Sequence, residues 1–382
     1  MEKILTGSLL EIEAILLLNA LSLARTKPIA DRLLRGDSAT WILKDMENAH
    51  SDIVSAVQTK FDVRKEIQKC YEQGIKIITL ADKDYPLLLR MIPDPPLVLY
   101  VRGCLLESDR VSVALVGARK STPYGLVHAR RFGCELADAG WTVISGLAKG
   151  IDSAAHEGAL SVSHGRTIAV LGCGVDVVYP AENRTLYKRI EKSGAIISEF
   201  PLGAAPLAHH FPRRNRIISG LALGTFVLEA FLRSGSLITA QQSIEQGREV
   251  FALPGRIDEL TSMGTNKLIK DGATMIDSFE NLNRELVEAF NKWKFKNQTH
   301  IHDLHNIIEK ENSIVSSLKN NTDLTQDHGG SLCRMIPATG ISFDEFMSQS
   351  SISSAEASLE LIGLELERKI VRKADGLYYS LN

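Results

Sequence analysis

The 382-residue sequence predicts an α/β protein with a doubly wound, mostly parallel sheet, preceded and followed by smaller domains. Two observations carry this prediction. Between residues 111 and 253, short continuous apolar runs alternate with helical stretches. Several of these runs end directly at a glycine, as at Gly117, Gly146 and Gly172. Uninterrupted apolar strands separated by helices are typical of a parallel sheet that is covered on both faces.

The apolar runs place the predicted strands at Val111–Val116, Trp141–Ser145, Thr167–Leu171, Ala195–Phe200, Thr225–Leu228 and Glu249–Leu253. A helix over about residues 124–139 joins the first two strands. A short strand at 74–80 comes earlier, and the proline-containing stretch 93–101 leads into the sheet. We delimit this α/β domain as residues 76–285.

Residues 1–75 read as short helices with few strand formers, which predicts a small helical domain of the SAM or helix-hairpin-helix kind. Its predicted role is structural or adaptor. Residues 292–336 are polar and lack a sustained period, so they predict a linker. Residues 337–382 predict helix, helix and β-hairpin, with a turn at Asp375-Gly376, which is the pattern of a winged-helix domain.

Composition narrows the possible functions. The chain carries 44 basic and 46 acidic residues, so any nucleic-acid binding must come from a local basic patch. The five cysteines form no CxxC pair, which argues against a zinc site or a disulfide framework and fits a reduced, cytoplasmic setting. No apolar run is long enough to span a membrane. His300, His302 and His305 in the polar linker lack cysteine neighbours, and we expect neither metal nor cofactor.

The carboxyl ends of the strands are the predicted ligand site, because doubly wound sheets bind ligands there. Glycines let backbone N–H groups approach an anion, and helix N-termini add a favourable dipole. The residues that follow the first two strands supply glycines, hydrogen-bond donors and positive charge: Gly117, Arg119, Ser121, Tyr124, Ser145, Gly146, Lys149 and Gly150. This edge of the sheet is therefore expected to bind a phosphate or another anion.

The stretch Phe211–Gly220 carries three arginines and no acid, and it lies between apolar segments. Arginines held close to a core usually have a planar or phosphate partner. We therefore add Arg213, Arg214, Asn215 and Arg216 to the expected site. The alternative interpretation is a helix N-terminus with ordinary surface arginines.

Motifs for the common phosphate ligands are missing. No G-x-G-x-x-G follows the first strand, no G-x-x-x-x-G-K-[ST] occurs, and no serine stands in a G-x-S-x-G turn. The predicted site is thus a phosphate cradle without a dinucleotide or triphosphate signature.

Ordered motifs across residues 75–280 resemble the bacterial DNA-processing protein A family (DprA, also called Smf). The motifs are Asp84-Tyr85-Pro86, Gly117-Ala118-Arg119, Ser145 to Asp152, Phe211 to Ile218, Ser234 to Ala240, Pro254-Gly255 and Gly264 to Ile269. One departure is Ala118, where the family often has Ser or Thr, so one hydroxyl donor near phosphate would be missing.

The resemblance implies an extended Rossmann-like domain that binds single-stranded DNA and forms a homodimer. It also implies a recombination mediator that protects incoming DNA and loads the RecA recombinase during natural transformation, without being an enzyme. On the family's motifs, Arg119 and Lys149 fall in a positive DNA pocket, and Ser234, Gly235 and Ser236 belong to the same expected site. Residues 256–276 are the candidate dimer interface.

Single-strand binding also needs stacking platforms, for which Tyr124, Tyr179, Phe200 and Phe211 are the candidates. The competing hypothesis is a nucleotide-processing enzyme similar to the lysine-decarboxylase-like phosphoribohydrolases, which carry a P-G-G-x-G-T-x-x-E motif. Thr239 stands where the catalytic glutamate of that motif would be, so its general acid/base is missing. Glu199 and Glu229 are the carboxylates that could substitute.

Overall fold

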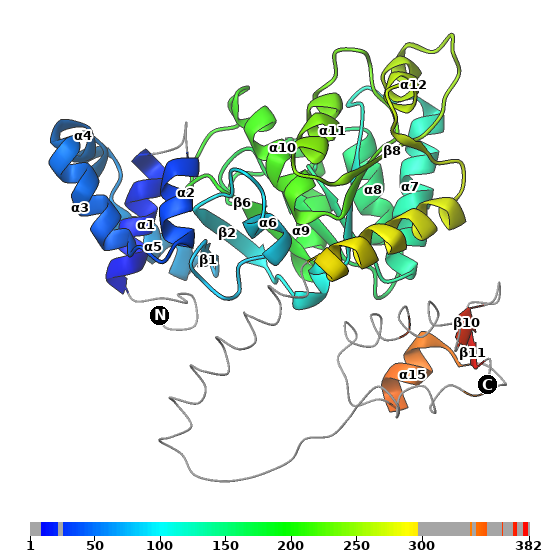
Figure 1. Cartoon of the computed structure of the whole chain (residues 1–382), viewed down its shortest axis with the longest axis horizontal. Helices are drawn as coiled ribbons and strands as arrows, with labels where there is room; N and C mark the ends of the chain where they lie inside the picture. Colours follow the sequence, from blue (N-terminus) through cyan, green and yellow to red (C-terminus); the bar gives the residue numbers. More distant parts are fainter. Residues whose placement is uncertain are drawn as a thin grey trace. The chain divides into compact units, whose positions relative to one another are not determined.

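The computed structural model describes residues 9–21, 26–296, 337, 341–349, 361, 370–372 and 377–380. The chain forms two compact units, Met1–Lys292 and Trp293–Asn382. The first unit joins the N-terminal helices to the sheet, and it is shown from blue to yellow in Figure 1.

The first unit is built on a nine-stranded sheet in the order β1-β2-β6-β5-β4-β3-β7-β8-β9. Strands β3 to β9 run parallel to one another, whereas β2 is antiparallel to both β6 and β1. The strands are β1 (Lys76–Thr79), β2 (Val98–Gly103), β3 (Ser112–Val116), β4 (Thr142–Ser145), β5 (Thr167–Val170), β6 (Ala195–Ser198), β7 (Gly224–Val227), β8 (Glu249–Ala252) and β9 (Thr274–Met275). The predicted mostly parallel sheet is confirmed.

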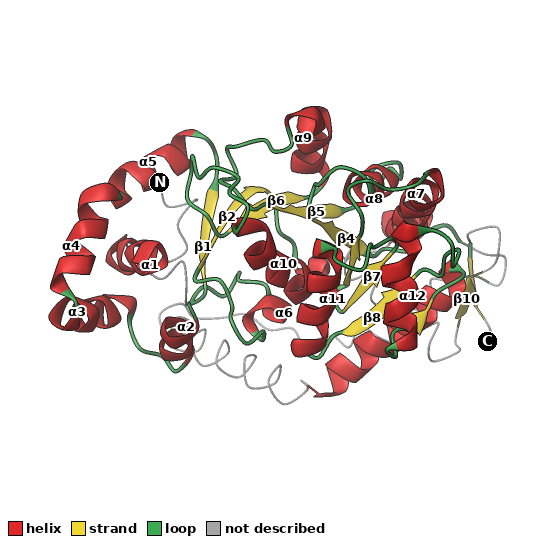
Figure 2. Ribbon diagram, turned by 90° about the horizontal axis from the view of Figure 1, so that it is seen from above, coloured by secondary structure: helices red, strands yellow, loops and turns green. Residues whose placement is uncertain are grey.

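Helices cover both faces of this sheet (Figure 2). One face carries α7 (Pro123–Asp138), α8 (Ile151–Ala159) and α9 (Arg184–Ser193). The other carries α6 (Leu87–Arg90), α10 (His210–Leu221), α11 (Gly235–Glu245) and α12 (Met263–Lys270). The chain winds from β3 outward to β6, and then returns through α10 to β7 on the other side of β3. The strand order therefore reverses between β3 and β7, and such a switch point is where doubly wound sheets bind ligands.

The proline-containing stretch 93–101 contributes more than expected. Residues 93–101 were expected only to lead into the sheet, but β2 lies inside it between β1 and β6. Val98, Leu99, Tyr100 and Val101 are all buried, because β2 has a neighbour on each side.

The N-terminal region is helical, as predicted. It contains α1 (Leu9–Leu21), α2 (Lys27–Leu34), α3 (Ala39–Ala49), α4 (Ser51–Lys60) and α5 (Val63–Glu72). Helix α1 is apolar on most sides and packs against α3, α4, α5 and strand β2. Its residues Ile12, Ile15, Leu16 and Leu18 belong to the same buried cluster as the residues of the sheet.

A helix over residues 279–296 follows β9, so residues 292–296 are helical where the linker was predicted to have begun. The rest of that linker, including His300, His302 and His305, lies outside the described residues. In the second unit the structure describes α15 (Phe343–Gln349) and an antiparallel pair formed by β10 (Ile370–Arg372) and β11 (Tyr378–Ser380). Most of the predicted winged helix, including the turn at Asp375-Gly376, is not described. Across the described residues, no helix combines the length and apolarity needed to cross a membrane.

Candidate functional site

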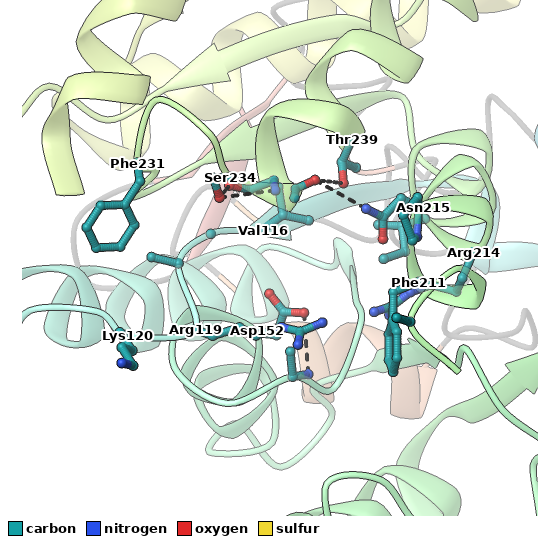
Figure 3. A pocket seen from close by; sticks show the side chains of 18 of the residues that line it. Val116, Arg119, Lys120, Asp152, Phe211, Arg214, Asn215, Phe231, Ser234 and Thr239 are labelled. Atoms are coloured by element: carbon teal, nitrogen blue, oxygen red, sulfur yellow. Dashed lines mark hydrogen bonds between the residues drawn. The ribbon is translucent and has the colours of Figure 1, made fainter. Parts of the chain in front are cut away.

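An open pocket lies at the carboxyl ends of the strands, at the switch point of the sheet (Figure 3). Its volume is about 570 Å³, within the usual range for ligand sites. The lining comes from the segments at the carboxyl ends of five strands and from the helices that follow them. These segments are Val116 to Lys120 at β3, Ala148 and Asp152 after β4, Tyr179 after β5, some residues between Pro206 and Ile218 after β6, and some residues between Phe231 and Thr239 after β7.

Arg119 is the exposed cation of the β3 loop. Its guanidinium lies over the ring of Phe211, 5.1 Å from the ring centroid, so the side chain reaches across the pocket toward α10. Within the described part of the chain, Arg119 makes no ion pair. The charge of Arg119 still acts on the nearby carboxyl of Asp152 and opposes the rise of its pKa. A cation that is stacked on an aromatic ring and engaged in no close ion pair is available to an anionic ligand.

The β4–α8 loop is folded tightly beneath this cation. Gly150 adopts φ +81°, and a side chain there would meet the carbonyl oxygen of Ala118 at 2.4 Å. Leu147 also has a positive φ, 55°, although it is not a glycine. This left-handed conformation is uncommon for a branched residue and is kept only where the surroundings fix it. The loop therefore brings backbone from β4 against backbone from β3.

Arg214 is the buried cation of the pocket. It is 3% exposed, and its Nη1 donates a 2.5 Å hydrogen bond to the carbonyl oxygen of Val170. Its Nε has no hydrogen-bond partner among the described residues. Burial lowers the pKa of Arg214 to about 10, partly offset by the charge of Asp152, so the guanidinium stays charged at neutral pH. Buried cations of this kind normally need an anionic partner.

Asp152 is the carboxylate of the pocket, and it is held by backbone amides. It accepts hydrogen bonds from the N–H groups of Gly146 at 3.2 Å and Ala148 at 3.4 Å. Burial raises the pKa of Asp152, while the charge of Arg214 opposes that rise. The pocket lining thus combines one acid with four basic residues, Arg119, Lys120, Arg214 and Arg233.

The N-terminus of α11 forms the opposite wall. Ser234 caps this helix by accepting a hydrogen bond from Ser236 N at 3.3 Å, and the two hydroxyl groups lie 2.6 Å apart. Asn215 on α10 donates to the carbonyl oxygen of Gly235 at 3.2 Å, which ties the two helices together at the pocket. The first amides of a helix favour negative charge.

The structure divides the fifteen residues expected at the site. Those that line the pocket are Gly117, Arg119, Arg214, Asn215, Ser234, Gly235 and Ser236. Those that do not line it are Ser121, Tyr124, Ser145, Gly146, Lys149, Gly150, Arg213 and Arg216. Several of the second group support the pocket from behind, as the glycines of the β4–α8 loop do.

Arg216 and Arg213 do not have the role that the sequence predicted for them. Both Nη atoms of Arg216 donate to the carboxylate of Glu199, at 2.9 and 2.8 Å, and its Nε donates to Asp94 at 3.1 Å. Arg213 also lies 2.9 Å from Glu199, which is fully buried. These two arginines, expected to face phosphate, instead neutralise an internal carboxylate. The reason is that α10 packs against the sheet on the side that carries them.

Ser145 is a further correction, because its hydroxyl is buried and donates to the carbonyl oxygen of Leu115 at 2.6 Å. Lys149 is exposed but lies outside the pocket lining, where its Nζ is 2.5 Å from Glu182. Glu182 belongs to the 3-10 helix η2 (Ala181–Asn183). Lys149 is thus at the rim, and it is already paired with an acid.

Two of the four aromatic candidates border the pocket. Tyr179 and Phe211 line it, and their ring centroids are 5.5 Å apart. Phe200 is buried and stacks on His210, with centroids 4.0 Å apart, so it is a core residue. Tyr124 lies outside the lining and donates its hydroxyl to the carbonyl oxygen of Pro254 at 3.0 Å.

Sequence reasoning missed Lys120, Asp152, Phe231 and Arg233, all of which line the pocket. Lys120 and Asp152 stand inside stretches that were already singled out, one directly after Arg119 and the other two residues after Gly150. Phe231 and Arg233 follow β7, and only the reversal of strand order brings that strand beside β3.

The two carboxylates considered for catalysis both have structural partners. Glu199 binds Arg216, as described above. Glu229 accepts hydrogen bonds from the N–H group and the hydroxyl of Thr122, which caps α7. Among the described residues, no group of three or more histidine, cysteine or carboxylate side chains could hold a metal ion.

Fold and site together define a class: a Rossmann-like α/β protein with a basic, aromatic-edged pocket at the switch point of its sheet. A family model for "DNA recombination-mediator protein A" matches residues 76–287, and the chain belongs to that family. This confirms the resemblance drawn from the motifs.

Similar proteins agree with this assignment. The chain is 43% identical over 219 residues to the DNA processing protein DprA of Bacillus subtilis, covering 57% of this chain and 73% of that one. It is 43% identical over 259 residues to protein Smf of Escherichia coli, covering 64% of this chain and 68% of that one.

Two solved structures share the fold. The X-ray structure of DprA from Streptococcus pneumoniae aligns with a TM-score of 0.63 at 33% identity, covering 74% of this chain and 99% of that chain. A structure of DprA from Helicobacter pylori, reported for its unique single-stranded DNA binding mode, aligns with a TM-score of 0.51 at 33% identity. It covers 56% of this chain and 96% of that one.

Proposed function

We propose that this protein binds single-stranded DNA at the strand-end pocket, with little dependence on sequence. The observation that carries the proposal is the pair of cations in one pocket: exposed Arg119, which forms no ion pair with any described residue, and buried Arg214, which also lines the pocket. The positive charge of both guanidinium groups in one pocket favours a phosphodiester group as the ligand.

The rest of the lining supports a single strand as the ligand. Tyr179, Phe211 and Phe231 offer aromatic surface, which stacks on any base regardless of its identity. Lys120 and Arg233 add positive charge for neighbouring phosphates. Because the whole chain has a formal net charge of −2, this local cluster is what would attract DNA.

We propose further that the protein acts in the cytoplasm as a recombination mediator, which protects incoming strands and passes them to the RecA recombinase during natural transformation. Membership of the family supports this role. The domain boundaries at residues 75, 285 and 337, and the winged-helix fold of the last segment, belong to the same proposal.

A homodimer through the α/β domain completes the proposal. The segment 256–276 exposes four large apolar side chains, Ile257, Leu260, Met263 and Met275, and Ile257 is 94% exposed. An exposed apolar group of this kind is typical of a protein interface. Light scattering on the full chain should give twice the monomer mass, and Ile257→Glu with Leu260→Glu should give the monomer.

Fluorescence anisotropy with single-stranded and duplex oligonucleotides of equal length tests the binding proposal. We expect tighter binding of the single strand, with log K falling against log salt by about 0.7 for each phosphate contacted. Equal affinity for duplex would contradict the proposal. A nucleotide-hydrolysis assay runs beside it, and hydrolysis without DNA binding would favour the competing enzyme hypothesis.

A further inference from the structure

One wall of the pocket is carried by a segment without regular structure. Residues 199–209 connect β6 to α10, and they contain neither helix nor strand. This connection and the helix after it supply Pro206, Ala208, Phe211, Arg214 and Asn215 to the pocket lining. A wall of this kind keeps its shape only if other parts of the chain hold it.

The N-terminal helices hold the beginning of this connection. Asn19 on α1 is 2% exposed, and its Nδ2 donates to the carbonyl oxygen of Glu199 at 3.2 Å. The partners are 180 residues apart in the chain. Glu199 is also the carboxylate that binds Arg213 and Arg216, so Asn19 touches the residue on which the start of α10 is anchored.

Glu66 on α5 makes a second contact, three residues further along the connection. Its Oε1 accepts a hydrogen bond from Leu202 N at 2.7 Å. Glu66 is 6% exposed, and burial raises the pKa of its carboxyl, although the bond from Leu202 opposes that rise. A buried carboxylate is normally stabilised by hydrogen-bond donors, and the donor here is the backbone N–H of Leu202.

Thr26, at the start of α2, makes a third contact through Asp94. The hydroxyl of Thr26 donates to Oδ1 of Asp94, and Oδ2 of the same carboxylate accepts from Arg216 Nε at 3.1 Å. Arg216 lies two residues after Arg214 on α10. Three of the N-terminal helices therefore reach the same wall at separate points.

We propose that the N-terminal helical region positions the β6–α10 wall of the pocket, with Asn19, Glu66 and Thr26 as positioning residues. The inference rests on the proposed function for its binding readout. It implies coupling: a partner or substitution that breaks these contacts changes the affinity of the pocket, and a ligand in the pocket stabilises the three contacts. None of the three residues lines the pocket or needs to touch the ligand.

The test uses the full chain with two variants. Asn19→Leu removes the bond to Glu199, and Glu66→Ala removes the bond from Leu202 N together with the interaction of the carboxylate with Tyr100. Glu66→Gln is the conservative variant, since its amide oxygen can still accept from Leu202 N. Ile42→Ala is the matched control, because Ile42 is buried in α3 and truncation destabilises the same helices without touching the connection. Thermal melting confirms that every variant is folded at the assay temperature.

Two measurements are made on each variant. Hydrogen exchange of the ligand-free protein should show faster exchange over residues 201–215 in Asn19→Leu and Glu66→Ala, and not in Ile42→Ala or Glu66→Gln. Single-strand affinity should fall by about fivefold or more in the first two variants and stay near wild type in the others. The salt dependence should be unchanged, because no phosphate contact is lost.

The outcomes separate this inference from the proposed function. Unchanged exchange over residues 201–215, or an affinity that follows stability equally in all variants, would overturn the positioning role. If wild type fails to bind single strands, the proposed function fails, and the exchange measurement still decides whether the N-terminal helices order the pocket wall.

Discussion

Arg216 and Glu199 form a two-point ion pair inside the protein, with both Nη atoms of the arginine on the two carboxylate oxygens. Burial alone would lower the pKa of Arg216, but the charges of Glu199 and Asp94 hold it above its ordinary value. The pair links the end of β6 to α10, and so it determines which arginines of the helix remain for a ligand.

Breaking this pair should destabilise the fold. Glu199→Gln leaves the buried Arg216 with weaker compensation, and we expect the free energy of unfolding to fall by about 3–5 kcal/mol. Urea unfolding followed by circular dichroism measures this. Glu191→Gln is the control, since its pair with Arg102 is longer, 3.7 Å, and partly exposed. A loss no larger than that of the control would contradict the internal role of Arg216.

Arg119→Ala should separate binding from stability. The side chain is exposed and forms no ion pair with any residue that the structure describes, so its loss should leave the melting temperature nearly unchanged. A charged hydrogen bond to phosphate contributes roughly 1.5–3 kcal/mol, so single-strand affinity should fall about tenfold or more. Arg130→Ala, which removes an exposed arginine paired with Glu157, is the control in both measurements. Undiminished binding by Arg119→Ala would show that the site lies elsewhere.

Lys149 and Glu182 should have opposite effects on DNA binding. Their exposed ion pair at the rim must open before Lys149 can meet a phosphate. We expect Lys149→Ala to weaken single-strand binding and Glu182→Gln to strengthen it, each by about twofold or more, with a smaller effect at high salt. Anisotropy titrations at two salt concentrations measure both. If Glu182→Gln binds no more tightly than wild type, Lys149 is not a DNA contact.

Gly146→Ala should damage the pocket from behind. A Cβ atom there would lie 1.9 Å from Nη1 of Arg214, so the guanidinium must leave its place on Val170. We expect both stability and single-strand affinity to fall. Gly235→Ala is the contrast, because a Cβ atom at that position meets no atom within 4 Å. It should leave melting unchanged, and equal destabilisation by the two changes would contradict the packing described here.

Stability should fall as the pH drops from about 7 to about 5, and His156 should carry part of that change. Its Nδ1 lies 2.7 Å from Thr167 Oγ1, and its Nε2 has no partner among the described residues. Burial, followed by the charge of Arg214, lowers the pKa of His156 from 6.5 to about 3.

The sign follows from the proton balance. Between pH 6.5 and about pH 3, His156 binds a proton in the unfolded chain and does not bind one in the folded chain. Acid therefore favours unfolding by up to about 1.4 kcal/mol per pH unit. His156→Gln should reduce the slope of unfolding free energy against pH, whereas His164→Gln, at an exposed histidine, should not. Identical slopes in all three proteins would refute a buried neutral His156.

Much of the architecture could be predicted from local pattern. Short continuous apolar runs that end at glycine, such as Val113 to Val116, predict buried strands, and the glycines after them mark the tight loops at which a parallel sheet binds ligands. Arg119 was found in this way, because a cation directly after a buried strand must emerge at the carboxyl edge. The position of β2 in the sheet could not be predicted, because a short apolar run does not indicate which strands it pairs with.

Only the tertiary structure decided which arginines of α10 face the pocket. Successive helical residues are rotated by 100°, so Arg214 and Arg216 project from nearly opposite sides of the helix. Which side meets Glu199 depends on how α10 packs on the sheet, because the irregular β6–α10 connection separates Glu199 from the helix. The sequence by itself determined a sheet with a basic carboxyl edge. Long-range packing assigned Arg216 to an internal carboxylate, Arg214 to the pocket, and Asn19 to the wall beside it.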